Sequence, residues 1–263
     1  MITLFDFPTA LPGKTLSVYV WKIRLALNIK GLQHQTQWVS FSEIEKELKK
    51  AGLPPSKDIP TNNFGTRYTV PALHDPSTNT KISDSKAILK YLDDAYPETL
   101  QLTAQPKVDP QLDDLVAEAF GPSWPLAFAM ILHIYTTQVS KVVLGGLQGE
   151  DSAKYRMRME GMLKTTVEDW MQNTEGLEES LKKGREAFRA ADDWLEKSRK
   201  IHGGKWALGD NITLADIEIG TVLAFLASVL GEEDKLWNEI IQEWDEGRWG
   251  VYWNQIKQYT QVL

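Results

Sequence analysis

Cysteine is absent from the 263 residues of this chain. Its absence excludes disulfides, thiolate zinc sites, iron–sulfur clusters and a cysteine nucleophile. Basic residues are outnumbered as well, since 29 Lys and Arg against 36 Asp and Glu give a formal net charge of −7. A general binder of nucleic acid or anionic membranes needs clustered Lys and Arg, so we expect neither partner. Any thiol chemistry must therefore use a thiol that another molecule brings.

Long apolar segments and metal-ligand patterns are also scarce. The longest stretch without Asp, Glu, Lys or Arg, residues 119–140, could span a bilayer by length, but it contains two prolines, a histidine and several other polar residues. A buried helix of a soluble protein explains it better. The four histidines show no ligand spacing, so we expect no metal site. The opening residues, MITLFDFPTALPG, lack the features of a secretory signal, and we expect a cytoplasmic protein.

The first ninety-six residues alternate between strand-like and helix-like patterns. Short β-branched and aromatic runs predict strands at 2–7, 35–41, 68–74 and 80–82. Apolar residues at helical spacing, or charge-rich helical composition, predict helices at 17–30, 43–51 and 83–96. The residues between the last two strands, DPSTN, are typical of a hairpin turn. The predicted order is therefore βαβ followed by ββα.

After Pro97 the strand patterns nearly vanish. Residues 106–110 have the composition of a linker, and from Gln111 onward amphipathic helices follow one another, separated at glycines. The predicted fold class is α/β plus all-α. We expect an α/β domain at 1–97, a linker at 98–110 and an all-helical domain at 111–263.

A proline interrupts the strand-like run at 68–74. Pro71 would delete a ladder hydrogen bond unless it starts a strand or sits in a cis turn. On frequency alone a trans proline that starts a strand is favoured, because only about 5–6% of X–Pro bonds are cis. A cis bond after Val70 would instead turn the backbone N–H and C=O of Val70 outward, ready to pair with an extended peptide.

Two predicted helix starts carry residues that suit an anion. Asp84 and Ser85 open one helix, where free N–H groups and the helix dipole favour a carboxylate, while the neighbouring Asp84 suits an ammonium. Ser17 opens another, and its hydroxyl can either cap that helix or donate to an anion. An ordinary helix cap is the alternative at both places. No histidine and aspartate pattern supports Ser17 as a nucleophile.

Two further features lie in the second half. Thr213 and Asp216 have the spacing of a capping box before an apolar helix, which indicates a structural role. Phe120, Trp124 and Phe128 belong to an aromatic-rich run. Core packing is the ordinary explanation for such a run, and an apolar pocket is the alternative.

Taken together, these motifs resemble the cytosolic glutathione transferase family. The run SVYVWKIRLALNIKGL from Ser17 is similar to the family's first helix, with a catalytic serine five residues before a Lys/Arg pair. The runs VPAL from Val70 and ISDSKAILKYL from residue 82 resemble its cis-proline and acidic-Ser signature, with Asp84 in place of the commoner Glu. The segment from Gly209 to Asp216 matches its capping motif. The first helix looks most like the etherase-related classes of wood-decay fungi, relatives of bacterial lignin β-etherases.

The resemblance implies a thioredoxin-like first domain and a set of roles. Ser17 would stabilise the thiolate of glutathione as co-substrate. Val70 before cis Pro71 would pair with its cysteinyl residue, Ser85 would hold the γ-glutamyl carboxylate, and Asp84 would orient that end. A Lys or Gln between residues 38 and 57 would meet the glycyl carboxylate.

Phe120, Trp124 and Phe128 would line the site of the second substrate, an aromatic electrophile or aryl ether, in a protein expected to form a homodimer. Three functions stay open. The first is a detoxifying transferase, the second is a ligandin that sequesters aromatic or polyphenolic molecules, and the third is a non-enzymatic regulator on the same fold.

Overall fold

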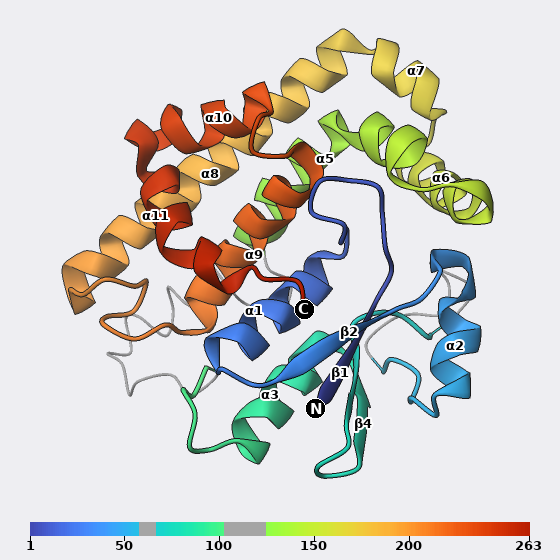
Figure 1. Cartoon of the computed structure of the whole chain (residues 1–263). Helices are drawn as coiled ribbons and strands as arrows, with labels where there is room; N and C mark the ends of the chain where they lie inside the picture. Colours follow the sequence, from blue (N-terminus) through green and yellow to red (C-terminus); the bar gives the residue numbers. More distant parts are fainter. Residues whose placement is uncertain (58–66, 103–124) are drawn as a thin grey trace.

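The computed structural model describes residues 1–57, 67–102 and 125–263. Figure 1 shows the strands β1, β2 and β4 in the lower half with α2 and α3 beside them, and the helices α5 to α11 above. Helix α1 lies between these two parts, because it packs against α3 on one side and α9 on the other. Ser17, which directly precedes α1, is therefore placed where the two parts meet.

The sheet has four strands in the order β2-β1-β3-β4. Strand β1 (Ile2–Asp6) pairs in parallel with β2 (His34–Trp38) and antiparallel with β3 (Ala72–Asp75). Strand β4 (Thr80–Ser83) completes the hairpin with β3. A parallel pair needs a crossover, which α1 supplies, and the hairpin follows from the turn after Asp75. The predicted βαβ–ββα order is confirmed.

The helices around the sheet lie close to their predicted positions. They are α1 (Val18–Ile29), the 3₁₀ helix η1 (Phe41–Glu43), α2 (Ile44–Lys50) and α3 (Ser85–Ala95). Two predicted strands were too long. The strand predicted at 35–41 ends at Trp38, and the strand predicted at 68–74 begins only at Ala72, after the turn at Pro71.

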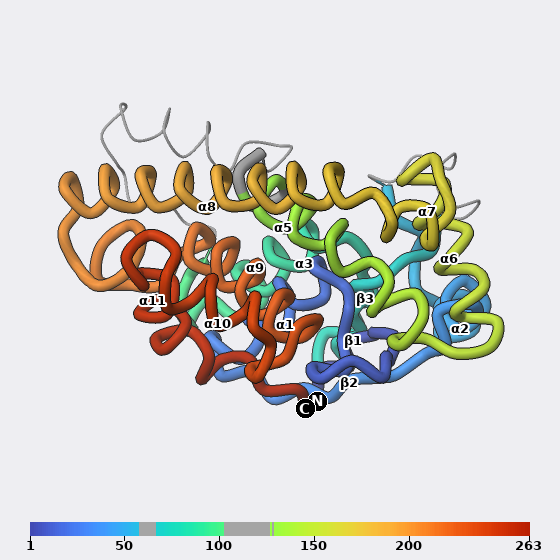
Figure 2. Tube along the Cα trace, turned by 90° about the horizontal axis from the view of Figure 1, so that it is seen from above, coloured from blue at the N-terminus to red at the C-terminus, as the bar shows by residue number. Residues whose placement is uncertain are grey.

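The described residues from 125 onward form helices and no strand. They are α5 (Pro125–Thr137), the π-helix η2 (Lys141–Gly146), α6 (Gly149–Leu163), α7 (Val167–Gln172), α8 (Thr174–His202), α9 (Leu214–Leu230), α10 (Lys235–Gln242), η3 (Trp244–Gly247), α11 (Arg248–Ile256) and η4 (Lys257–Tyr259). Figure 2 shows α8 running along one side of the molecule, and α8 packs against α5. Nearly every residue of α9 is buried, so α9 is the central helix of this bundle.

The predicted fold class is confirmed, since a small α/β part precedes an all-helical part. The exact domain boundaries at 97 and 111 stay a prediction, and most of the proposed linker lies outside the described residues. Over the part of the chain that the structure describes, no helix is both long enough and apolar enough to cross a bilayer.

Candidate functional site

Ser17 is the N-cap of α1, as predicted. Its Oγ accepts a hydrogen bond from the backbone N–H of Val20 at 3.3 Å. A serine hydroxyl can accept and donate at once, so this cap leaves the Ser17 proton available for an anion. The neighbouring Thr15 is differently placed, because its buried hydroxyl donates to Asp6. The cap and the anion-donor interpretations of Ser17 are therefore compatible.

The Val70–Pro71 peptide bond is cis. The expectation from proline frequency alone, a trans bond, was wrong, and the expectation from the family resemblance is confirmed. Pro71 directly precedes strand β3, which lies at the centre of the sheet between β1 and β4. Val70 is partly buried. Its pairing with a peptide ligand stays a prediction.

Asp84 stands at the N-cap of α3 but does not cap it. Within the described residues its side chain makes no cap hydrogen bond, and its backbone has φ of 76°. Its carboxylate accepts instead from the hydroxyl of Ser56 and from the backbone N–H of Lys57, the latter at 2.9 Å. The simple cap interpretation of Asp84 was therefore wrong. The turned-away side chain leaves the first N–H groups of α3, at Ser85, without a side-chain cap in the described structure.

These observations place three of the predicted binding elements on the sheet part. Ser17 begins α1, Val70 precedes β3, and Ser85 begins α3. Strand β3 pairs with β1, the strand that leads into α1, and with β4, the strand that leads into α3. The topology therefore connects all three positions through neighbouring strands.

The predicted aromatic site falls mostly outside the described residues. Phe120 and Trp124 lie outside the described residues, and Phe128 lies on α5 with no described side chain. Other aromatic residues, which the structure does describe, form a chain of contacts. The ring of Phe41 packs edge-on against Phe7 and Tyr155, and the hydroxyls of Tyr155 and Tyr135 lie 2.6 Å apart. These rings join the sheet part to α5 and α6.

A buried carboxylate at the start of the loop between β1 and α1, which ends at Ser17, was not predicted. Asp6, at the end of β1, has no exposed surface and accepts from Thr15, from the Phe7 N–H at 2.8 Å and from Arg24 at 3.0 Å. Burial raises the pKa of Asp6 to about 6, although the Arg24 charge and the hydrogen bonds act against that rise. The only sequence signal was a charged residue within an otherwise uncharged strand.

Two other charged contacts between the parts were also missed. Lys22 on α1 and Glu218 on α9 form an ion pair at 3.1 Å with both side chains buried. Burial lowers the pKa of Lys22 to about 8 against the opposing effect of Glu218, and burial raises the pKa of Glu218 well above its usual value. Asp151 on α6 accepts from the Ser40 hydroxyl at 2.6 Å and the Ser42 N–H at 2.7 Å.

The predicted capping box is confirmed. The carboxylate of Asp216 accepts from the backbone N–H of Thr213 at 2.8 Å, and the reciprocal cap is also present. The same carboxylate accepts from the Ala207 N–H at 2.8 Å and from the Tyr252 hydroxyl at 2.6 Å. Asp216 therefore joins α9 to the preceding loop and to α11.

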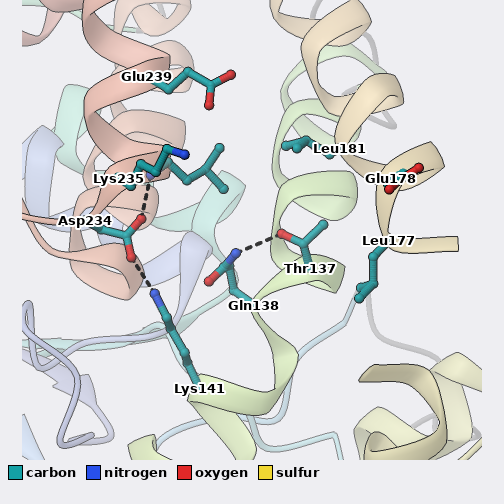
Figure 3. A pocket seen from close by; sticks show the side chains of 10 residues that line it. Thr137, Gln138, Lys141, Leu177, Glu178, Leu181, Asp234, Lys235 and Glu239 are labelled. Atoms are coloured by element: carbon teal, nitrogen blue, oxygen red, sulfur yellow. Dashed lines mark hydrogen bonds and ion pairs between the residues drawn. The ribbon is translucent and has the colours of Figure 1, made fainter. Parts of the chain in front are cut away.

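A separate hollow of about 390 Å³ lies in the helical part (Figure 3). Its walls come from α5, η2, α8 and α10, and an ion pair between Lys141 and Asp234 crosses one side. None of the predicted site residues lines it. Among the described residues no group of three or more His, Asp or Glu side chains could hold a metal ion.

The chain matches two family models. The model described as glutathione S-transferase, N-terminal domain, matches residues 16–95. The model described as glutathione S-transferase, C-terminal domain, matches residues 126–259, just over half of the chain. The chain therefore belongs to the glutathione S-transferase family.

Two solved fungal structures are similar over almost their whole length. The glutathione S-transferase CsGST63524 of Ceriporiopsis subvermispora, in complex with glutathione, is 29% identical with a TM-score of 0.81, covering 100% of this chain and 98% of that one. The glutathione transferase GSTFuA3 of Phanerochaete chrysosporium is 27% identical with a TM-score of 0.82 and the same coverage. Among curated proteins, the glutathione S-transferase-like protein ustS of Aspergillus flavus is 35% identical over 101 residues, 36% of this chain and 35% of that protein. That match spans about a third of the relative's length.

Proposed function

We propose that this chain is a glutathione transferase of the serine type, most similar to the etherase-related fungal classes. The observation that carries the proposal is the place of Ser17, whose hydroxyl caps α1 through its oxygen and keeps a proton to donate. Ser17 would donate that proton in a hydrogen bond to the sulfur of bound glutathione. The dipole of α1 would add to the stabilisation of the thiolate.

The required stabilisation is modest. A cysteine thiol has an unperturbed pKa of about 8.5, so only a few per cent is thiolate at pH 7. Each unit of depression needs about 1.4 kcal/mol, and a hydrogen bond to a charged group supplies roughly 1.5–3 kcal/mol. One hydroxyl donor at Ser17 is therefore enough to lower the thiol pKa by one or two units.

The remaining roles follow from the positions of the other residues. The backbone of Val70 would pair with the cysteinyl residue, and the uncapped start of α3 at Ser85 would hold the γ-glutamyl carboxylate. Asp84 would help to orient that end. Its contacts with Ser56 and Lys57 add a second role, because they hold residues 56 and 57 against the start of α3.

The proposed reaction is substitution at an electrophilic carbon of an apolar aromatic compound or aryl ether. The glutathione thiolate forms the sulfur–carbon bond, the bond to the leaving group breaks with its electron pair, and the thiol proton passes to solvent. Phe120, Trp124 and Phe128 stay the predicted contacts of this second substrate. The similarity to a fungal transferase solved with glutathione supports the co-substrate.

A ligandin role, in detoxification by sequestration, uses the same site with little turnover. A panel of aromatic electrophiles, assayed for conjugation while binding is measured alongside, separates the two roles. The expected cytoplasmic homodimer stays a prediction. Analytical ultracentrifugation of the purified chain tests the dimer directly.

The decisive experiment on Ser17 follows the ultraviolet absorbance of enzyme-bound thiolate against pH. Ser17→Ala should raise the pKa of the bound thiol and slow conjugation near neutral pH, with much of the rate recovered at higher pH. Glutathione affinity should stay within a few fold, because the sulfur is a small part of the ligand.

Thr166→Ala is the matched control, since Thr166 caps α7 through a hydrogen bond from the Asp169 N–H at 3.0 Å. That variant loses a cap of the same kind on a different helix and should titrate as the wild type. Superimposable curves for Ser17→Ala and the wild type would exclude the donor role of Ser17.

A further inference from the structure

The loop between β1 and α1 is held by the helical part of the molecule. Figure 1 shows this loop rising from the sheet toward α5 before it turns back into α1. The N–H of Ala10 donates to the carbonyl of Gly146 in η2 at 2.8 Å. The N–H of Gly13 donates to the carbonyl of Ser228 in α9 at 3.1 Å. The loop that ends at Ser17 is therefore anchored on two helices of the other part.

Thr15 is fixed from both parts at once. Its hydroxyl donates to Asp6 at the end of β1, and its carbonyl accepts from the hydroxyl of Ser228 on α9. All three residues are buried, with exposed fractions of 0% for Thr15 and Asp6 and 2% for Ser228. Asp6 is itself held by Arg24. Thr15 thus has little freedom to move relative to either part.

The contact with α9 is also close in space. A Cβ atom placed on Gly13 would lie 2.3 Å from Oγ and 2.6 Å from Cα of Ser228, so only glycine fits. Leu16, between Thr15 and Ser17, is buried with 4% of its surface exposed. Because the packed Leu16 connects them, a displacement of Thr15 would also displace Ser17, two positions along the chain.

We propose that Ser228 and Asp6, acting through Thr15, are positioning residues for the Ser17 hydroxyl, so that α9 completes the thiolate site of the sheet part. This inference rests on the proposed function of Ser17. The strength of a hydrogen bond falls steeply with misalignment. A displaced α1 start would keep glutathione bound through Val70 and Ser85 but would weaken the donation to its sulfur.

Ser228→Ala is the first test, because it removes the hydroxyl and keeps the backbone bond to Gly13. The pKa of the bound thiol should rise by about 0.5, equivalent to roughly a threefold loss of thiolate and of conjugation rate below that pKa. Raising the pH should restore the rate, and glutathione affinity should change by less than about twofold.

Ser198→Ala is the matched control. Ser198 is fully buried in α8, and its hydroxyl donates to the carbonyl of Ala207. The variant therefore loses a buried hydroxyl-to-carbonyl hydrogen bond, as Ser228→Ala does, but away from the β1–α1 loop. It should lower the melting temperature comparably without moving the thiol pKa. The pair of variants separates the stability of the bundle from the position of Ser17.

Thr15 provides a second series. Thr15→Val keeps the side-chain volume nearly constant but removes the hydroxyl that donates to Asp6. This variant should raise the pKa of the bound thiol. Thr15→Ser returns the hydroxyl and should restore the wild-type titration. This rescue keeps the inference testable if Ser228→Ala does not fold.

Three outcomes would overturn the inference in distinguishable ways. If Ser17→Ala itself leaves the thiol titration unchanged, the proposed donor role fails and the positioning role fails with it. If Ser17→Ala raises the pKa while Ser228→Ala and Thr15→Val titrate as the wild type, the donor role stands and the positioning role is wrong. If Ser198→Ala reproduces the shift of Ser228→Ala, the effect is a general loosening of the bundle.

Discussion

Replacing Asp216 by alanine should destabilise the fold far more than removing the cap residue Thr213. The carboxylate of Asp216 has no exposed surface and accepts four hydrogen bonds, two of them from the backbone N–H and hydroxyl of Thr213. The other two come from the Ala207 N–H and the Tyr252 hydroxyl. The Thr213 hydroxyl can rotate toward another acceptor, but Asp216→Ala would leave the other three donors, two backbone N–H groups and a phenol, without their acceptor inside the bundle.

The magnitude follows from those three donors. Each buried donor left unpaired costs about 1–3 kcal/mol, so the three together cost roughly 3–9 kcal/mol. Removal of the carboxylate also relieves its burial, which raises the pKa of Asp216 in the folded chain, and this relief offsets part of the cost. We therefore expect a loss of about 3–5 kcal/mol for Asp216→Ala. Thr213→Ala should cost about 1 kcal/mol, the usual value for a lost N-cap.

Urea unfolding followed by tryptophan fluorescence measures both variants. Protein concentration must be held constant, because any self-association of the folded chain would shift the midpoint. Glutathione affinity should be unchanged in the folded state of both, since neither residue belongs to the proposed ligand site. If Asp216→Ala is no less stable than Thr213→Ala, the hydrogen bonds of Asp216 to Ala207 and Tyr252 add nothing to the free energy of unfolding beyond the cap.

Three further predictions address the ligand site, pH and the contact between the parts. Ser85→Ala and Asp84→Ala should each weaken glutathione binding by about 1–3 kcal/mol in calorimetry, and wild-type affinity in both would remove the role of the α3 start. Because burial raises the pKa of Asp6 from 3.8 to about 6, the folded chain binds a proton there that the unfolded chain has already lost, so the contribution of Asp6 to the free energy of unfolding should fall by about 2 kcal/mol as pH rises from 4 to 6.5. Asp6→Asn should make that fall smaller by the same amount, and a slope equal to that of the wild type would refute the assignment. Asp151→Ala should lower the free energy of unfolding by about 1–3 kcal/mol, because it leaves the N–H groups of residues 41 and 42 without their acceptor. Glu150→Gln, at an exposed position, loses only an ion pair with Lys154 and should cost less than about 1 kcal/mol. Equal losses of stability in the two variants would contradict the stabilising role of the Asp151 contact.

The two misplaced strand ends show where local patterns are insufficient. Residues 39–41 include the β-branched Val39 and the aromatic Phe41, which favour a strand, but the backbone N–H groups of Phe41 and Ser42 donate to Asp151 of α6 rather than to a neighbouring strand. The strand predicted at 68–74 begins late because the chain turns at Pro71. In both cases a local pattern favours a strand, and a contact or turn outside that pattern ends it.

Local patterns also predicted only part of the candidate site. Ser17 and Ser85 were identified because helix starts carry free N–H groups, a property that depends only on the next few residues. The cis bond at Pro71 was not predictable from frequency and came only from the family resemblance. Asp84 showed the limit of local reasoning, since its side chain binds residues 56 and 57 instead of its own helix.

The sequence by itself determined the order of strands and helices, the helix caps at Ser17 and Thr213, and the absence of a thiol in the chain itself. Each depends on periodicity, on side chains within one helical turn, or on composition. Only the tertiary structure decided what holds Ser17 in place. Thr15 and Ser228 are 213 positions apart, and Lys22 meets Glu218 from a different helix. Such contacts form because folding brings helix faces together to bury their apolar surface, and no local spacing encodes which polar groups then meet.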